Sequence, residues 1–269
     1  MTVYSPSQSE RFIRCPRLWD YSRRWDTDGG HWMERAIGTA IHAGVAAHFR
    51  GLIPDTDHST EDPTRAAIDT LRDEWMADEP GFEGAEAFVL KGLKRALALD
   101  IGARGATILA VEETYGEERC RLDLAYQTDQ GITIVDWKYT HNAGDWVISK
   151  RLQEAEVSWQ LRHYAWRVSQ AFPTVPVVGA GIALIVGGPV AKARWAPVEI
   201  TPALLLDWQN SAARVWLDIE GCVNGERYPR AHMGQACLMY GGCPLYDGCH
   251  RLYGDESRFH TLYQRREPK

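Results

Sequence analysis

Two aspartates and a lysine lie close together around one predicted turn of the sequence. Asp123 ends the run RCRLD, and Asp136 and Lys138 belong to the run IVDWK. Because side chains alternate between the two faces of a strand, Asp136 and Lys138 share a face. A pair of carboxylates with a neighbouring ammonium group can bind Mg²⁺ or Mn²⁺ and assist the attack of water on a phosphate.

These residues belong to a predicted β-hairpin. Strands are expected over residues 119–127 and 132–139, joined by the turn 128–131. If this turn holds an even number of residues, the numbers of paired residues sum to 259, and Asp123 lies opposite Asp136. Two opposed carboxylates repel each other, so we expect a divalent cation between them.

The other face of the hairpin is apolar. Leu122 and Leu124 are expected on the same face as Trp137, so that the sheet is covered on both sides. The alternative is an exposed hairpin on which Asp136 and Lys138 are merely solvated. Unpaired charges inside a covered sheet are costly, and we therefore favour a metal site.

Apolar periodicity predicts a mixed α/β fold around this hairpin. Further strands are expected over residues 108–114, 177–186 and 193–200. Short helices are expected on both sides of Cys15-Pro16, and longer ones over residues 36–50, 63–76, 85–101, 149–170 and 202–221. The order predicts an N-terminal helical region, a central sheet flanked by helices, and an irregular tail that carries cysteines.

Composition and charge restrict the class of protein. The 269 residues are 45% hydrophobic and 25% charged, which excludes a disordered or collagen-like chain. The net charge is -6, but residues 51–90 hold eleven acidic and two basic residues, so the remainder is mildly basic. Pro and Gly interrupt the apolar run 175–190, and no secretory signal is visible at the start. We therefore expect a cytoplasmic protein without a membrane span.

Four sequence elements resemble, in their order, the PD-(D/E)XK nuclease superfamily in its RecB-like branch. That branch shows a helical His, an Asp in a strand, a D/E-x-K in the next strand and a Q-x-x-x-Y on the following helix. The elements of this chain are His42, Asp123, Asp136-Trp137-Lys138 and Gln160-Leu-Arg-His-Tyr164. The resemblance implies a mixed central sheet of the restriction-endonuclease-like type.

The resemblance also implies a role for each element. The implied ligands of Mg²⁺ or Mn²⁺ are His42, Asp123, Asp136 and the backbone carbonyl of Trp137. Lys138 would serve the attacking water, and Gln160 and Tyr164, which share one helix face, would line the DNA path and complete the catalytic set. Glu112 or Glu113, in the strand before the hairpin, could add a carboxylate, but a solvated strand residue is the favoured interpretation, and both are left outside the site.

Four cysteines come from opposite ends of the chain: Cys15, Cys237, Cys243 and Cys249. Sets of four thiolates bind zinc or an iron–sulfur cluster. Zinc sites usually contain a tight C-x₂₋₄-C pair, which is missing here, but spacing alone leaves zinc, an iron–sulfur cluster and unligated cysteines open. One cysteine before the core and three after it resembles the iron–sulfur subgroup of RecB-like nucleases, which includes the AddB nuclease domain and the fourth CRISPR-associated protein family. In that subgroup the cluster joins the two chain ends, and the resemblance therefore implies a [4Fe–4S] cluster on these four cysteines.

We expect a single nuclease domain over residues 1–269, with a helical lead-in at 1–105, a catalytic α/β core at 106–200 and a helix plus cluster-binding tail at 201–269. The predicted function is a metal-dependent DNA exonuclease acting on single strands or DNA ends. No G-x-x-x-x-G-K-[ST] motif is present, so the chain carries no motor: either it works alone, or it works with a helicase, recombination or CRISPR adaptation protein. Two alternatives stay open: a DNA-binding module with vestigial carboxylates, and an end-trimming subunit of a CRISPR adaptation or recombination complex with little activity alone.

Overall fold

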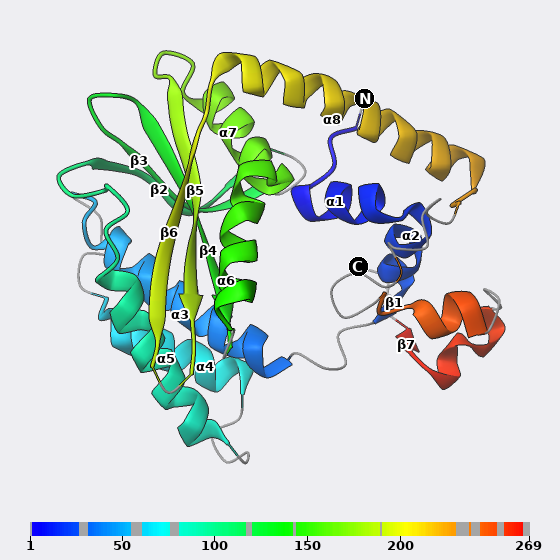
Figure 1. Cartoon of the computed structure of the whole chain (residues 1–269), viewed down its shortest axis with the longest axis horizontal. Helices are drawn as coiled ribbons and strands as arrows, with labels where there is room; N and C mark the ends of the chain where they lie inside the picture. Colours follow the sequence, from blue (N-terminus) through cyan, green and yellow to red (C-terminus); the bar gives the residue numbers. More distant parts are fainter. Residues whose placement is uncertain are drawn as a thin grey trace. The chain divides into compact units, whose positions relative to one another are not determined.

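A five-stranded mixed sheet forms the centre of the larger of two compact units, Trp32–Asp207 (Figure 1). The strands, in their order across the sheet, are β2 (Thr107–Tyr115), β3 (Cys120–Gln127), β4 (Ile132–Thr140), β5 (Val177–Val186) and β6 (Lys192–Glu199). β4 and β5 pair in parallel, and the other neighbours pair antiparallel. A parallel pair needs a crossover connection, which here is helical.

The computed structural model describes the greater part of the chain. The described residues are 2–26, 32–54, 61–75, 81–116, 120–141, 144–188, 190–229, 237, 243–251 and 256–265. Among them, none of the helices has both the length and the apolar character that a bilayer crossing requires.

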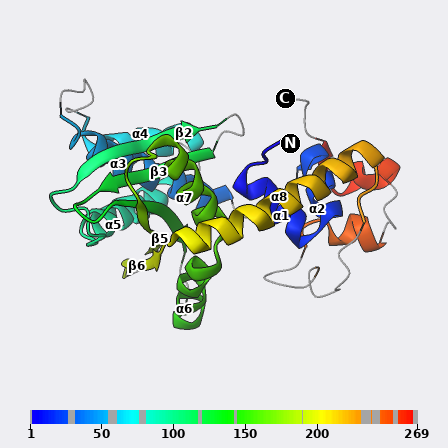
Figure 2. The same ribbon diagram turned by 90° about the horizontal axis from the view of Figure 1, so that it is seen from above.

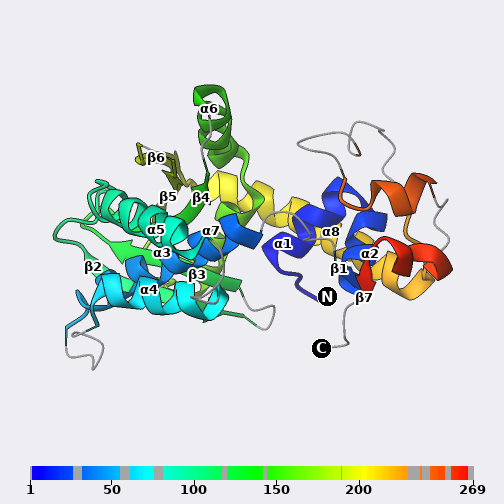
Figure 3. The same cartoon turned by 90° about the horizontal axis from the view of Figure 1, so that it is seen from below.

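Helices cover both faces of the sheet (Figures 1 and 3). One face packs against α3 (Trp32–Arg50), α4 (Pro63–Glu74) and α5 (Phe82–Leu97). The other packs against α6 (Asp145–Gln153), the short 3-10 helix Glu154–Val157 and α7 (Trp159–Ala171). In β4, Val135 and Trp137 contact the first set of helices while Ile134 contacts the second. This alternation turns Asp136 and Lys138 toward the α7 side.

All five predicted strands form, and their ends differ from the expected ones by at most one residue. The prediction of one continuous helix over residues 149–170 is wrong, because the helix is interrupted between α6 and α7. Ser158 is the cause: its backbone is extended, and its hydroxyl accepts a hydrogen bond from the backbone N–H of Leu161 at 3.2 Å. A serine in this position begins a new helix rather than continuing the old one.

The smaller compact unit combines residues 1–31 with residues 208–269 (Figure 2). Its elements are α1 (Pro6–Arg14), α2 (Pro16–Arg24), most of α8 (Pro202–Gly225), a π-helical turn (Asp247–Arg251), a 3-10 helix (Glu256–Thr261), and the paired strands β1 (Trp25–Asp26) and β7 (Gln264–Arg265). The indole Nε1 of Trp216 donates to the hydroxyl of Ser9 at 3.2 Å and links α8 to α1. The single domain expected over residues 1–269, with divisions after residues 105 and 200, stays a prediction.

Candidate active site

The ladder between β3 and β4 ends where the predicted carboxylates lie. It runs from Gln127–Ile132 to Leu124–Val135 in the register expected from the sequence. Beyond that pair, the backbone N–H of Trp137 donates to Oδ2 of Asp123 at 2.7 Å. The side chain of Asp123 thus takes the position of a strand carbonyl, and it lies level with Asp136.

The alternation of side chains along β3 changes at Asp123. Leu124 packs on the same face as Trp137, as expected, but Leu122 belongs to the apolar cluster on the opposite face. The expectation that both leucines share the Trp137 face is therefore wrong for Leu122. The reason is a local irregularity across two strands, since Glu112 in β2 has a left-handed φ of 54° and is not paired with Asp123 in the ladder.

Glu112 belongs to the candidate site by its position, although the sequence analysis left it out. Its neighbours Val111 and Glu113 pair with Leu124 and Leu122, so Glu112 lies level with Asp123. Three carboxylates therefore occupy one row across β2, β3 and β4. The signal in the sequence was a pair of adjacent glutamates, but regular alternation does not reveal that the backbone turns the first of them toward the site.

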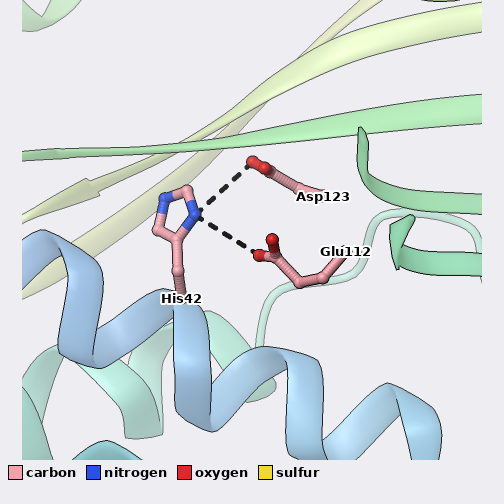
Figure 4. A group of neighbouring side chains, drawn as sticks. All are labelled: His42, Glu112 and Asp123. Atoms are coloured by element: carbon pink, nitrogen blue, oxygen red, sulfur yellow. Dashed lines mark ion pairs between the residues drawn. The ribbon is translucent and has the colours of Figure 1, made fainter. Parts of the chain in front are cut away.

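His42 of α3 approaches this row from the face of the sheet that α3, α4 and α5 cover (Figure 4). Its Nδ1 lies 3.6 Å from Oδ2 of Asp123 and 3.9 Å from Oε1 of Glu112. One ligand atom from each of these three residues, here called the His–Glu–Asp group, lies within 4.8 Å of the other two. Gly38, one turn earlier, lets the helix come close: a Cβ there would lie 3.4 Å from the Cβ of Tyr139.

Burial and mutual repulsion set the charge states of these groups. Burial, reinforced by the charge of Asp136, raises the pKa of Asp123 to about 7. Burial, reinforced by the charge of Asp123, also raises the pKa of Glu112. Burial lowers the pKa of His42 although the neighbouring carboxylates oppose the shift. At neutral pH the imidazole is therefore uncharged and able to ligate a metal, and a cation would relieve the crowded carboxylates.

The raised pKa of Asp123 predicts that the metal-free protein loses stability as the pH rises from about 4 to about 7. Over that range the unfolded chain has released a proton that native Asp123 retains. The free energy of unfolding should then fall by up to ~1.4 kcal/mol per pH unit from this group alone. Asp123→Asn should flatten that part of the profile. The measurement is the melting temperature in EDTA from about pH 4.5 to about pH 8, which spans most of the window between the pKa of Asp123 in the unfolded chain and its pKa in the native protein.

The comparison between variant and native protein isolates Asp123, because His42, with its lowered pKa, changes stability in the opposite direction over part of the range. Asp129→Asn is the matched control, since Asp129 is exposed in the hairpin turn. A pH profile for Asp123→Asn that parallels the native one would contradict the assigned pKa.

Lys138 joins Asp136 to the residues of the predicted Q-x-x-x-Y element. Its Nζ lies 2.9 Å from Oδ2 of Asp136 and donates to Oε1 of Gln160 at 3.0 Å. The amide Nε2 of Gln160 in turn donates to the hydroxyl of Tyr164 at 2.6 Å. Asp136 is almost fully buried, at 2% exposure, whereas 45% of the Lys138 side chain is exposed. The structure thus brings Gln160 and Tyr164 to the lysine, which they hold in place.

A cavity of about 920 Å³ opens beside the His–Glu–Asp group, between α3 and α4. Its α4 wall is acidic and carries Asp62, Asp69 and Asp73. Two arginines of the lining are already paired: Arg65 lies 3.4 Å from Asp69, and Arg50 lies 3.9 Å from Glu61. A wall with this charge favours the approach of divalent cations.

The four cysteines of the predicted cluster all lie in the smaller unit. Cys15 and Cys243 pack against an apolar cluster that contains the buried Cys249. The backbone N–H of Cys243 donates to the carbonyl of Cys237 at 2.7 Å, and burial, reinforced by the nearby Cys237 and Cys15, raises the pKa of the Cys243 thiol. None of the six cysteines, all of which lie among the described residues, forms a disulfide.

Comparison with known proteins gives a family and likenesses to solved structures. The family model described as the PD-(D/E)XK nuclease superfamily matches residues 3–250. A crystal structure named "Putative exonuclease", from Eubacterium rectale, is similar with 14% sequence identity and a TM-score of 0.47, over 88% of this chain and 87% of that chain. No curated protein sequence matches this chain.

Proposed function

The chain belongs to the PD-(D/E)XK nuclease superfamily, and on this premise we propose that it is a metal-dependent deoxyribonuclease that degrades single-stranded DNA or DNA from its ends. One observation carries the proposal: Asp123 and Asp136 lie level on neighbouring strands, with the Lys138 ammonium on Asp136 and a neutral imidazole at Asp123. Metal-dependent hydrolysis of a phosphodiester uses anionic ligands that hold a divalent cation beside the scissile phosphate.

The donor set fits Mg²⁺ or Mn²⁺. Carboxylate oxygens suit both ions, and the imidazole of His42 makes Mn²⁺ especially suitable. His42, Asp123, Asp136 and the backbone carbonyl of Trp137 are the proposed ligands, and the hydrogen bond between His42 and the Trp137 backbone supports a carbonyl that faces the site. A bound ion would lower the pKa of water and balance the negative charge that develops on the phosphate.

The protein's own groups would orient the reaction. Asp136 and Gln160 hold the Lys138 Nζ between two oxygen atoms, so the ammonium has a fixed direction. From that position it would orient the attacking water and donate a hydrogen bond to the phosphate as charge builds. Tyr164 is buried, and its burial raises the pKa of its hydroxyl, so it stays protonated and anchors Gln160.

We propose a structural [4Fe–4S] cluster held by Cys15, Cys237, Cys243 and Cys249. Its support is the packing of Cys15, Cys243 and Cys249 at one apolar cluster in the smaller unit, together with the backbone hydrogen bond from Cys243 to Cys237. The absence of a tight cysteine pair in the sequence keeps zinc as the second choice. We also propose a reducing cytoplasm as its compartment, in which thiol ligands would stay reduced.

The test of the proposed function is the degradation of end-labelled DNA, single-stranded and double-stranded, with Mn²⁺ or with EDTA. We expect single strands and exposed ends to be shortened with Mn²⁺ and to remain intact with EDTA. Asp136→Ala, purified in the same way, controls for contaminating nucleases. Equal degradation by the native protein and Asp136→Ala would refute the proposal. Activity seen only after a helicase, recombination or CRISPR adaptation protein is added would identify an end-trimming subunit instead.

A further inference from the structure

The backbone of Glu112 is strained in a place where the sheet could have been regular. A left-handed φ of 54° is rare outside glycine, and a glutamate adopts it only with backbone strain. The pairs on either side, Val111–Leu124 and Glu113–Leu122, are regular. Strain of this kind persists where the local conformation serves a purpose, and here it turns a carboxylate toward His42 and Asp123.

We propose, on the basis of the proposed function, that Glu112 is a further ligand of the divalent ion, that Arg121 occupies its carboxylate in the ion-free protein, and that ion binding releases Arg121 to a DNA phosphate. Glu112 and Arg121 both lie outside the ligand set implied by the family resemblance. Exchange of the salt bridge between them would make the metal and the DNA bind cooperatively.

Glu112 is positioned to bind an ion together with His42 and Asp123. Its side chain is only 10% exposed, and its Oε1 lies 3.9 Å from Nδ1 of His42. Together with Asp123 it offers oxygen and nitrogen donors within 4.8 Å of one another. Two buried carboxylates beside a neutral imidazole are costly without a cation, and a shared divalent ion would remove that cost.

In this structure Glu112 is paired with Arg121. Nε of Arg121 lies 2.6 Å from Oε2 of Glu112. The Arg121 side chain is 64% exposed, so it can leave the carboxylate without opening the core. A divalent ion and the guanidinium would compete for the same carboxylate.

Arg121, once released from Glu112, would remain close to the bound ion. The residue lines the same cavity as the His–Glu–Asp group, and it is two residues before Asp123 on β3. The other cavity arginines, Arg50 and Arg65, are paired with acidic residues that are no part of the metal site. A released guanidinium beside the bound ion would present its planar fork to a phosphate of the DNA.

The test measures Mn²⁺ binding by calorimetry without DNA, and DNA binding by fluorescence anisotropy with Ca²⁺, which binds oxygen ligands and serves as the non-cleaving ion. Glu112→Gln should weaken Mn²⁺ binding at least about tenfold. Arg121→Ala should tighten Mn²⁺ binding about threefold to fivefold and weaken DNA binding. In the Glu112→Gln background, Arg121→Ala should no longer change Mn²⁺ affinity. Arg65→Ala, which removes another cavity arginine, should leave Mn²⁺ affinity near the native value.

Opposite signs for Arg121→Ala in the two assays separate the proposed exchange from a general structural role, which would weaken both. The inference is overturned if Glu112→Gln binds Mn²⁺ as tightly as the native protein, or if Arg121→Ala leaves Mn²⁺ affinity unchanged or lower. These outcomes differ from failure of the proposed function, in which the native protein itself neither binds Mn²⁺ nor degrades DNA.

Discussion

Lys138→Ala is expected to slow DNA hydrolysis by about 10²–10⁴-fold while the protein still binds Mn²⁺ and DNA. The Nζ of Lys138 is held between Asp136 and Gln160, at 2.9 Å and 3.0 Å, so it occupies one defined position beside the carboxylates. Alanine removes the group that orients water and supports the phosphate, but it leaves every proposed metal ligand in place. The measurement is single-turnover cleavage of labelled DNA at saturating Mn²⁺, together with the DNA affinity.

Lys192→Ala is the matched control for this variant. Lys192 also has a side chain that is 45% exposed and pairs with an aspartate, its Nζ lying 3.7 Å from Oδ1 of Asp145. We expect native cleavage from Lys192→Ala. A rate for Lys138→Ala within a few fold of the native rate would remove the lysine from the mechanism, and a loss explained entirely by weaker DNA binding would reduce it to a binding residue.

Cys15→Ala is expected to abolish the iron–sulfur cluster and to destabilise the smaller unit. Protein purified without oxygen should contain about four irons and four sulfides per chain and be brown, whereas the variant should be colourless. A cluster that connects Cys15 to Cys237, 222 positions later, closes a long loop, so its loss should cost several kcal/mol. The measurements are iron content, visible absorption and thermal unfolding.

Cys222→Ala supplies the control, because this cysteine lies on α8 outside the proposed set of four. It should keep the colour and the iron. Mn²⁺ binding should survive in Cys15→Ala, since the proposed active site lies wholly within Trp32–Asp207. Colourless native protein that contains zinc would replace the iron assignment, and native protein without any metal would remove the cluster altogether.

Much of the larger unit was predictable from sequence because its signals are local. The period-two apolar pattern and the turn at residues 128–131 fix the register of β3 against β4, and they place Asp123 level with Asp136. The four-residue spacing of Gln160 and Tyr164 puts both on one face of α7. These features depend on neighbours in the chain, which a single sequence displays.

The parts that were not predictable depend on departures from regular geometry. The left-handed conformation of Glu112 and the change of faces at Leu122 follow from contacts among β2, β3 and α3. Ser158 shows a milder case, because a serine is compatible with a helix interior and with a cap, and only tertiary packing selects the cap. The salt bridge between Arg121 and Glu112 joins residues whose proximity becomes visible only once the strands are paired.

The composition of the smaller unit from residues 1–31 and 208–269 has a consequence for biosynthesis. On the ribosome, the N-terminal helices emerge first and lack their packing partners from residues 208–269. Trp32–Asp207 contains all five strands of its own sheet, so it can fold as soon as it has left the exit tunnel. The first helices should therefore be open to proteases or chaperones until residues 208–269 have been synthesised. A cluster held by Cys15 and the three late thiols could be assembled only after Cys249 has left the ribosome.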